Sequence, residues 1–136
     1  MPLQLHIPRE PRNTRLVRQA AILGFGVFLL VVTYLALTPG PSAPPGILGI
    51  DKVEHFAAFA VLAILARAAW PSIRAWGIGV SLLVYGVLIE TIQASPILMR
   101  TASAGDVIAD LAGILGGLLV VSLWQKFASR YETAPR

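Results

Sequence analysis

The stretch Tyr85-Gly-Val-Leu-Ile-Glu90-Thr-Ile-Gln93 ends an apolar run that starts at Ala75 and contains no charge before Glu90. Glu90 and Gln93 are three residues apart, which places a carboxylate and an amide on one face of a helix. Gly86 lies one turn before Glu90 on that face and allows another backbone to approach closely. An ionisable group in an apolar span is costly without a partner or water. The stretch therefore predicts a membrane helix that ends in a polar site.

The composition indicates an integral membrane protein. Of the 136 residues, 56% are hydrophobic and 13% are charged, and the mean hydropathy is +0.72, whereas soluble domains carry about 25% charged residues. The absence of cysteine excludes disulfides, thiolate catalysis and Cys-based metal centres. The net charge of +4 comes from basic residues that flank apolar segments, and no nucleic-acid-binding motif is present. We expect a lipid bilayer, and no nucleic acid, as the partner.

Four apolar segments are long enough to cross a membrane, since about 20 apolar residues span a ~30 Å hydrocarbon core. Their expected limits are approximately 19–37, 52–70, 75–93 and 106–124. They form one domain, residues 18–125, and proline-containing turns separate them. Residues 1–17 and 126–136 are expected to be polar tails. The predicted fold class is all-α, a four-helix bundle integral to the membrane.

The distribution of basic residues predicts the orientation of this bundle. Nine of the 11 lysines and arginines fall at the ends on the side of the N-terminus, and only Lys52 and Arg100 fall at the other ends. Cytoplasmic segments carry the excess of basic residues, so we expect both termini to be cytoplasmic. The external ends then collect one histidine and five of the 7 acidic residues: Asp51, Glu54, His55, Glu90, Asp106 and Asp110.

Four pieces of the chain resemble the VanZ-like family of small membrane proteins, and the resemblance covers residues 47–123. The pieces are Asp51-Lys-x-x-His55-Phe56, Tyr85-Gly-x-x-x-Glu90-x-x-Gln93, Arg100, and Asp106-x-x-x-Asp110-x-x-Gly113. The family pattern often has asparagine where this chain has Asp110. The family is named for a protein associated with low-level resistance to the glycopeptide teicoplanin. The resemblance implies a multi-pass protein of the bacterial inner (cytoplasmic) membrane with a polar site, and it implies no particular reaction.

The candidate ligand-binding residues combine this resemblance with the clustering of polar groups. They are Asp51, Lys52, His55, Glu90, Gln93, Arg100, Asp106 and Asp110. Glu90 and His55 are the candidate catalytic residues, because a carboxylate and an imidazole can act as acid and base. Arg100 suits an anionic group, since a guanidinium binds phosphate or carboxylate through two hydrogen bonds. No spacing matches a metal motif such as H-E-x-x-H, so we expect no metal and no other cofactor.

Several of these residues also have a purely structural explanation. Asp51 is equally well placed to cap a helix, and His55, one turn later, can contact its carboxylate. Lys52 can extend to lipid head groups, or it can form an ion pair with Glu90 or Asp106. Glu90 can form an ion pair with Lys52 or Arg100 that only holds the helices together.

The start of the fourth segment contains two further structural signals. Ser103-Ala-Gly-Asp106 is a helix-capping pattern. Asp106 and Asp110, one turn apart, cannot both ionise cheaply in apolar surroundings, so we expect one of them to have a raised pKa or the two to share a cation. Gly113-x-x-x-Gly117 is the small-residue pattern that lets helices pack closely, within this chain or in a homo-oligomer.

The leading functional hypothesis is a membrane protein that binds an anionic amphiphile of the cell envelope, or a glycopeptide, at the external ends of the second to fourth helices. One alternative is a membrane enzyme acting on a lipid intermediate, with Glu90 and His55 as acid and base. Another is a small accessory or assembly subunit of a larger membrane complex. Solute transport is disfavoured, because four spans without an internal repeat provide only a thin pathway.

Overall fold

The computed structural model describes residues 12–39, 50–98 and 103–132. These residues form four α-helices and one 3₁₀-helix, and no strand is found among them. The helices are α1 (Arg12–Leu37), α2 (Ile50–Ala69), α3 (Ala75–Gln93), the 3₁₀-helix η1 (Pro96–Leu98) and α4 (Ala104–Glu132). Three of them, α1, α3 and α4, are long and apolar enough to cross a membrane. The predicted all-α class is confirmed, and the helices are those of a multi-pass membrane protein.

Two helices extend beyond their predicted limits, whereas α3 matches its predicted segment. α1 begins at Arg12, inside the predicted tail 1–17, and α4 continues to Glu132, through much of the predicted tail 126–136. Arginine, lysine and alanine have high helix propensity in water as well as in lipid. Polar residues therefore end the apolar span without ending the helix.

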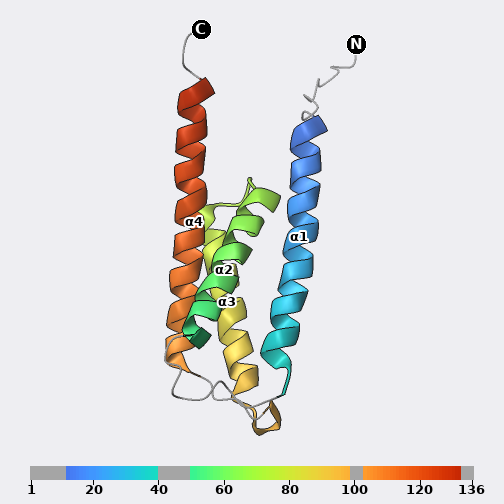
Figure 1. Cartoon of the computed structure of the whole chain (residues 1–136), viewed down its shortest axis with the longest axis vertical. Coiled ribbons are helices and arrows are strands. Elements are labelled where there is room, and N and C mark those ends of the chain that lie inside the picture. Colours follow the sequence, from blue (N-terminus) through green and yellow to red (C-terminus); the bar gives the residue numbers. More distant parts are fainter. Residues whose placement is uncertain (1–11, 40–49, 99–102, 133–136) are drawn as a thin grey trace, which may run out of the picture.

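α2 differs from the other helices in composition and in position. It has 20 residues but carries charges near both ends, including Asp51 and Arg67, and it is not among the helices that qualify as spans. In Figure 1, α2 lies between α1 and α4, with α3 behind it, and it contacts all three. The membrane span expected at residues 52–70 is therefore not confirmed, because α2 carries charges near both ends.

The hydrophobic core lies where α2 meets α3 and α4. Its members at most 5% exposed are Phe59, Leu62, Ala63, Ala66, Ile78, Leu82 and Ile114. Most of them come from α2, so the core is built around this helix. The core positions the start of α2 against the ends of α3 and α4.

α2 and α4 approach each other most closely at two glycines of α4. A Cβ atom on Gly113 would collide with the carbonyl oxygen of Phe56, and one on Gly117 would collide with that of Ala60. The prediction that both glycines face another helix is confirmed. The partner is α2 of the same chain, so this face is occupied within the protomer, and the alternative of a homo-oligomer through Gly113 and Gly117 is not supported.

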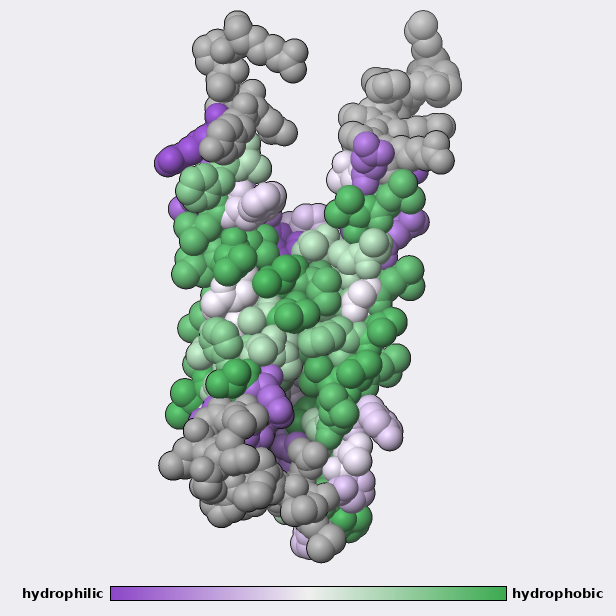
Figure 2. Space-filling model, viewed as in Figure 1, coloured by the Kyte–Doolittle hydropathy of each residue, from purple (hydrophilic) through white to green (hydrophobic). Residues whose placement is uncertain are grey.

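The surface of the molecule has the hydropathy pattern that a bilayer requires. Figure 2 shows a hydrophobic belt around the middle, with hydrophilic residues toward the end where both chain termini lie and a hydrophilic patch near the opposite end. Leu23, Leu30, Val80 and Leu119 in the helices that qualify as spans are each more than half exposed. Exposed apolar side chains in such numbers are compatible with a lipid environment.

Candidate functional site

Polar side chains from three helices meet at the end of the molecule opposite the termini (Figure 1). The start of α2, the end of α3 and the start of α4 converge there, next to the last turn of α1. They contribute Asp51, Lys52, Glu54, His55, Glu90, Gln93, Asp106 and Asp110. Arg100, the remaining predicted site residue, lies outside the described residues.

Asp110 of α4 is a buried partner for His55 of α2. The Nδ1 of His55 lies 2.8 Å from Oδ1 of Asp110, a hydrogen bond between residues 55 positions apart, and Asp110 is only 1% exposed. Gly86 of α3 makes room for this carboxylate, because a Cβ atom there would lie 2.6 Å from Oδ2 of Asp110. The groups that approach Gly86 closely are the side chains of Asp110 and Phe59, and not the backbone of another helix as predicted. The hydrogen bond of His55 is to Asp110, not to the neighbouring Asp51.

Asp106, one turn before Asp110, faces a different cation. Lys52 Nζ lies 3.5 Å from Oδ1 of Asp106, whose side chain is 5% exposed, whereas the lysine side chain is 54% exposed. The same Oδ1 atom is buried and accepts no hydrogen bond in the described structure. Asp106 and Asp110 therefore do not share a cation, which was one of the two expected arrangements. Asp110 is satisfied by His55, and Asp106 is held by a loose ion pair.

Glu90 ties the end of α3 to the start of α4. Its Oε2 accepts a 2.9 Å hydrogen bond from the backbone N–H of Ser103, while Oε1 is buried without a hydrogen-bond partner. Ser103 also caps α4, since its Oγ accepts a 3.1 Å hydrogen bond from the N–H of Gly105, which confirms the predicted cap. Lys52 pairs with Asp106, so the predicted alternative of a Glu90–Lys52 ion pair is not formed.

Gln93 joins α3 to α1. Its Nε2 donates a 2.8 Å hydrogen bond to the carbonyl oxygen of Ala36, in the last turn of α1, where carbonyls lack a partner within the helix. Gln93 therefore acts as an interhelical hydrogen-bond donor. A second link between these helices, between the hydroxyls of Thr33 and Tyr85 at 2.8 Å, had not been predicted from the sequence.

Asp51 lies close to both His55 and Asp106. α2 begins at Ile50, so Asp51 lies in the first turn of the helix and not at its cap position. One ligand atom each from Asp51, His55 and Asp106 lies within 4.8 Å of the other two. Two carboxylates and an imidazole at this separation have the donor types of a divalent metal site.

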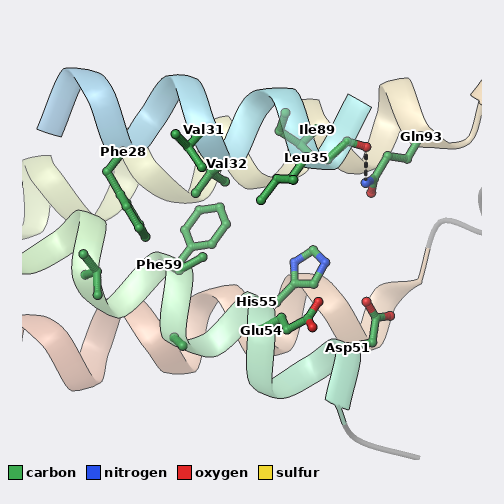
Figure 3. A pocket seen from close by; sticks show the side chains of 14 residues that line it. Phe28, Val31, Val32, Leu35, Asp51, Glu54, His55, Phe59, Ile89 and Gln93 are labelled. Carbon is green, nitrogen blue, oxygen red and sulfur yellow. Dashed lines mark hydrogen bonds between the residues drawn. The ribbon is translucent and has the colours of Figure 1, made fainter. Parts of the chain in front are cut away.

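An apolar groove leads away from this polar cluster. It has a volume of about 620 Å³, and Figure 3 shows Phe28, Val31, Val32 and Leu35 of α1 facing Phe59 of α2 across it. Asp51, Glu54, His55 and Gln93 line its other end (Figure 3). The α1 residues were not predicted as site residues, because an apolar side chain that lines a groove is indistinguishable in sequence from one that faces lipid.

The charge of the site is predominantly acidic. Five carboxylates gather among the described residues, whereas Lys52 is the one lysine or arginine there. None of Ser81, Ser103 and Ser122 is arranged as a nucleophile in the described structure. The hydroxyls of Ser81 and Ser122 donate to carbonyl oxygens one turn earlier in their own helices, and Ser103 caps α4. The arrangement can bind cations or hydrogen-bond donors, and it can exchange protons through His55 and Asp110.

The fold and the site together define a helical, multi-pass membrane protein with a polar cluster at the end of an apolar groove. No family model, no curated protein and no solved structure matches the chain. The function is therefore inferred from the geometry of the site.

Proposed function

We propose that this VanZ-like chain is a membrane protein that binds an amphiphile in the groove between α1 and α2, with the apolar chain against α1 and the head group at the polar cluster. The observation that supports this proposal is the continuity of the two surfaces. Apolar side chains of α1 and α2 face each other along the groove, and Asp51, His55 and Gln93 line its end (Figure 3).

The size of the groove suits part of a lipid. Ligand pockets have volumes of roughly 300–1,000 Å³ and are mostly apolar, with a few polar groups that set orientation. The groove, at about 620 Å³, falls in this range. Because bulk lipid offers an acyl chain equally apolar surroundings, selectivity must come from the shape of the groove and from the head group.

The acidic surroundings restrict the head group. An anionic head next to several carboxylates is repelled unless a cation lies between them. Lys52 is half exposed beside Asp106 and supplies one positive charge. The resemblance to VanZ-like proteins implies an envelope lipid or a glycopeptide as the ligand class, and with both termini cytoplasmic the cluster lies at the external leaflet of a bacterial inner membrane.

A groove-filling substitution tests this function. Ala57 is exposed and lines the groove, so Ala57→Trp fills the cavity without entering the core. Ala112→Trp is the matched control, because Ala112 is also exposed but lies on α4, away from the groove. We expect native mass spectrometry of gently purified protein to show bound lipid in the wild type and in Ala112→Trp, and to show several-fold less in Ala57→Trp.

Added phospholipids define the head-group preference in the same experiment. The protein is mixed with phosphatidylglycerol or with phosphatidylcholine of the same acyl chains, and the retained fraction is compared. Equal retention of lipid by Ala57→Trp and Ala112→Trp would contradict binding in the groove. Protein that carries no lipid in any form would contradict the proposed function altogether.

Catalysis is a second function that one observation favours. The half-buried imidazole of His55 and the buried carboxylate of Asp110 form a pair at 2.8 Å, the arrangement that orients a general base. Glu90, the other predicted catalytic residue, is instead bonded to the backbone of Ser103. An enzyme would convert its bound lipid, so a time-dependent mass change of that lipid, lost in His55→Gln, separates catalysis from binding. An accessory subunit would instead co-purify with a membrane protein partner and show no lipid selectivity.

A further inference from the structure

We propose that Asp51, His55 and Asp106 form a binding site for a divalent transition metal of the Zn²⁺ or Mn²⁺ class. This revises the expectation of no metal, which rested on the absence of a local sequence motif. The site deepens the proposed function, because a bound dication would supply the positive charge that an anionic head group needs. Its test requires no lipid, so the two proposals can fail separately.

The spacing of the three ligand atoms is close to that of a metal site. Each residue offers one atom, and the three atoms lie within 4.8 Å of one another. Ligands about 2.1 Å from a tetrahedral Zn²⁺ are about 3.4 Å apart. The cluster thus has to contract by at most about 1.4 Å by that estimate. Asp51, in the half-buried first turn of α2, can make this change by rotating its side chain.

Asp110 gives His55 the environment of a metal-ligating histidine. Such histidines usually donate the N–H of one ring nitrogen to a carboxylate or carbonyl, which fixes the ring and leaves the other nitrogen for the metal. His55 has this partner, since its Nδ1 is hydrogen-bonded to the buried Oδ1 of Asp110 at 2.8 Å. Ligation through Nε2 preserves this hydrogen bond. Asp110 is therefore a positioning residue of the site.

An unsatisfied oxygen atom is a second observation that favours cation binding at this cluster. Oδ1 of Asp106 is buried, accepts no hydrogen bond in the described structure, and has only the Lys52 ammonium group 3.5 Å away. Buried carboxylate oxygens are rarely left in this state without an ion or water. The Lys52 side chain is 54% exposed, so it can move into solvent when a metal replaces it.

The charge and the donor types decide the class of metal. Two carboxylates neutralise a dication, which reduces the cost of burying it. An imidazole nitrogen favours Zn²⁺ or Mn²⁺ over the harder, oxygen-preferring Ca²⁺. Three protein ligands also leave a coordination position open, which a phosphate or carboxylate oxygen of a head group can occupy.

Zinc titration of the purified full-length protein tests the site. The protein is stripped with EDTA in detergent, dialysed, and titrated with ZnCl₂ in a calorimeter, with CaCl₂ as the comparison ion. We expect one Zn²⁺ per chain and little response to Ca²⁺. Asp51→Asn should weaken zinc binding at least tenfold, while Glu54→Gln, which removes a carboxylate of the same helix that is not among the three ligands, should leave it unchanged.

A second pair of variants distinguishes a metal site from a purely structural ion-pair cluster. Lys52→Gln removes the competing ammonium group, so zinc should bind several-fold more tightly. Asp106→Asn should weaken zinc binding, and circular dichroism establishes that each variant is folded. If Asp106→Asn fails to fold, Asp51→Asn still decides, because Asp51 lies in the first turn of α2 and outside the core.

Three results would overturn the proposed metal site. They are the absence of stoichiometric zinc binding in folded wild-type protein, equal affinities of wild type and Asp51→Asn, and an equal loss of affinity in Glu54→Gln. Ala57→Trp separates this site from lipid binding. Zinc binding that persists in Ala57→Trp while lipid is lost supports both proposals, and lipid binding without any zinc binding leaves only the groove.

Discussion

Asp110 is the acidic residue whose surroundings are most completely defined, since it is 1% exposed and hydrogen-bonded to His55. Asp110→Asn keeps an oxygen that accepts the ring N–H, so we expect near wild-type stability. Asp110→Leu leaves His55 without its acceptor and should cost about 1–3 kcal/mol of unfolding free energy. Thermal unfolding in detergent measures both, and a fully stable Asp110→Leu variant would refute a structural role for this hydrogen bond.

Glu90 provides a second prediction for a single residue. Glu90→Gln retains an oxygen that can accept the Ser103 N–H, whereas Glu90→Ala removes the link between α3 and α4. We expect Glu90→Gln to unfold at nearly the wild-type temperature and Glu90→Ala to lose about 1–3 kcal/mol. Bound lipid should decrease in Glu90→Gln if the carboxylate charge takes part in binding.

A lower unfolding temperature of Glu90→Gln would instead show that Glu90 is one half of a structural ion pair. In that case Glu90→Gln itself lowers the unfolding temperature, because a cation is left unpaired, and Arg100→Gln in the same chain partly restores it. Measuring the single and double variants side by side therefore distinguishes the two roles.

At the scale of the helices, the contact between α2 and α4 is the most sensitive feature. A Cβ atom on Gly117 collides with the backbone of Ala60, whereas one on Gly116 has Phe56 Cζ as its nearest neighbour, at 3.5 Å. We expect Gly117→Ala to cost about 1–3 kcal/mol, because the helices must move apart. Gly116→Ala should be neutral or stabilising by up to about 1 kcal/mol, since alanine is the better helix former.

Thermal unfolding of these two neighbouring variants provides its own control, because both add one methyl group to the same helix. Equal melting temperatures for Gly116→Ala and Gly117→Ala would contradict the close packing of α2 against α4. The Gly113–Gly117 pattern was recognised from the sequence, but its partner was not, since a small-residue pattern suits any close helix.

At the scale of the whole molecule, η1 and the end of α4 lie at opposite ends (Figure 1). If both termini are cytoplasmic, as proposed, a cysteine at Ile97, which is 82% exposed in η1, should react with a membrane-impermeant maleimide added outside intact cells. A cysteine at Ser129, near the end of α4, should react only after the membrane is opened. The chain has no native cysteine, so each variant carries a single reactive site, and the reverse pattern would invert the topology.

The sequence alone determined the features that depend on neighbouring residues. The limits of α3, the cap at Ser103 and the apolar faces follow from local composition and helix periodicity, which act over one or two turns. The donor role of Gln93 was also predictable, because a buried amide in an apolar helix needs a partner. The same reasoning placed the start of α1 too late and the end of α4 too early, because it assumed that each helix ends where its apolar span ends.

Only the tertiary structure decided which polar groups meet. His55 and Asp110 are 55 residues apart, and their contact depends on how α2 and α4 are rotated where the glycines let them touch. A shift of α4 by one helical turn along its axis would bring His55 to Asp106 in place of Asp110, and no local sequence pattern specifies this register. The groove between α1 and α2 also depends on the tertiary structure. Its size is set by the distance between the two helices, and no single residue of the sequence specifies that distance.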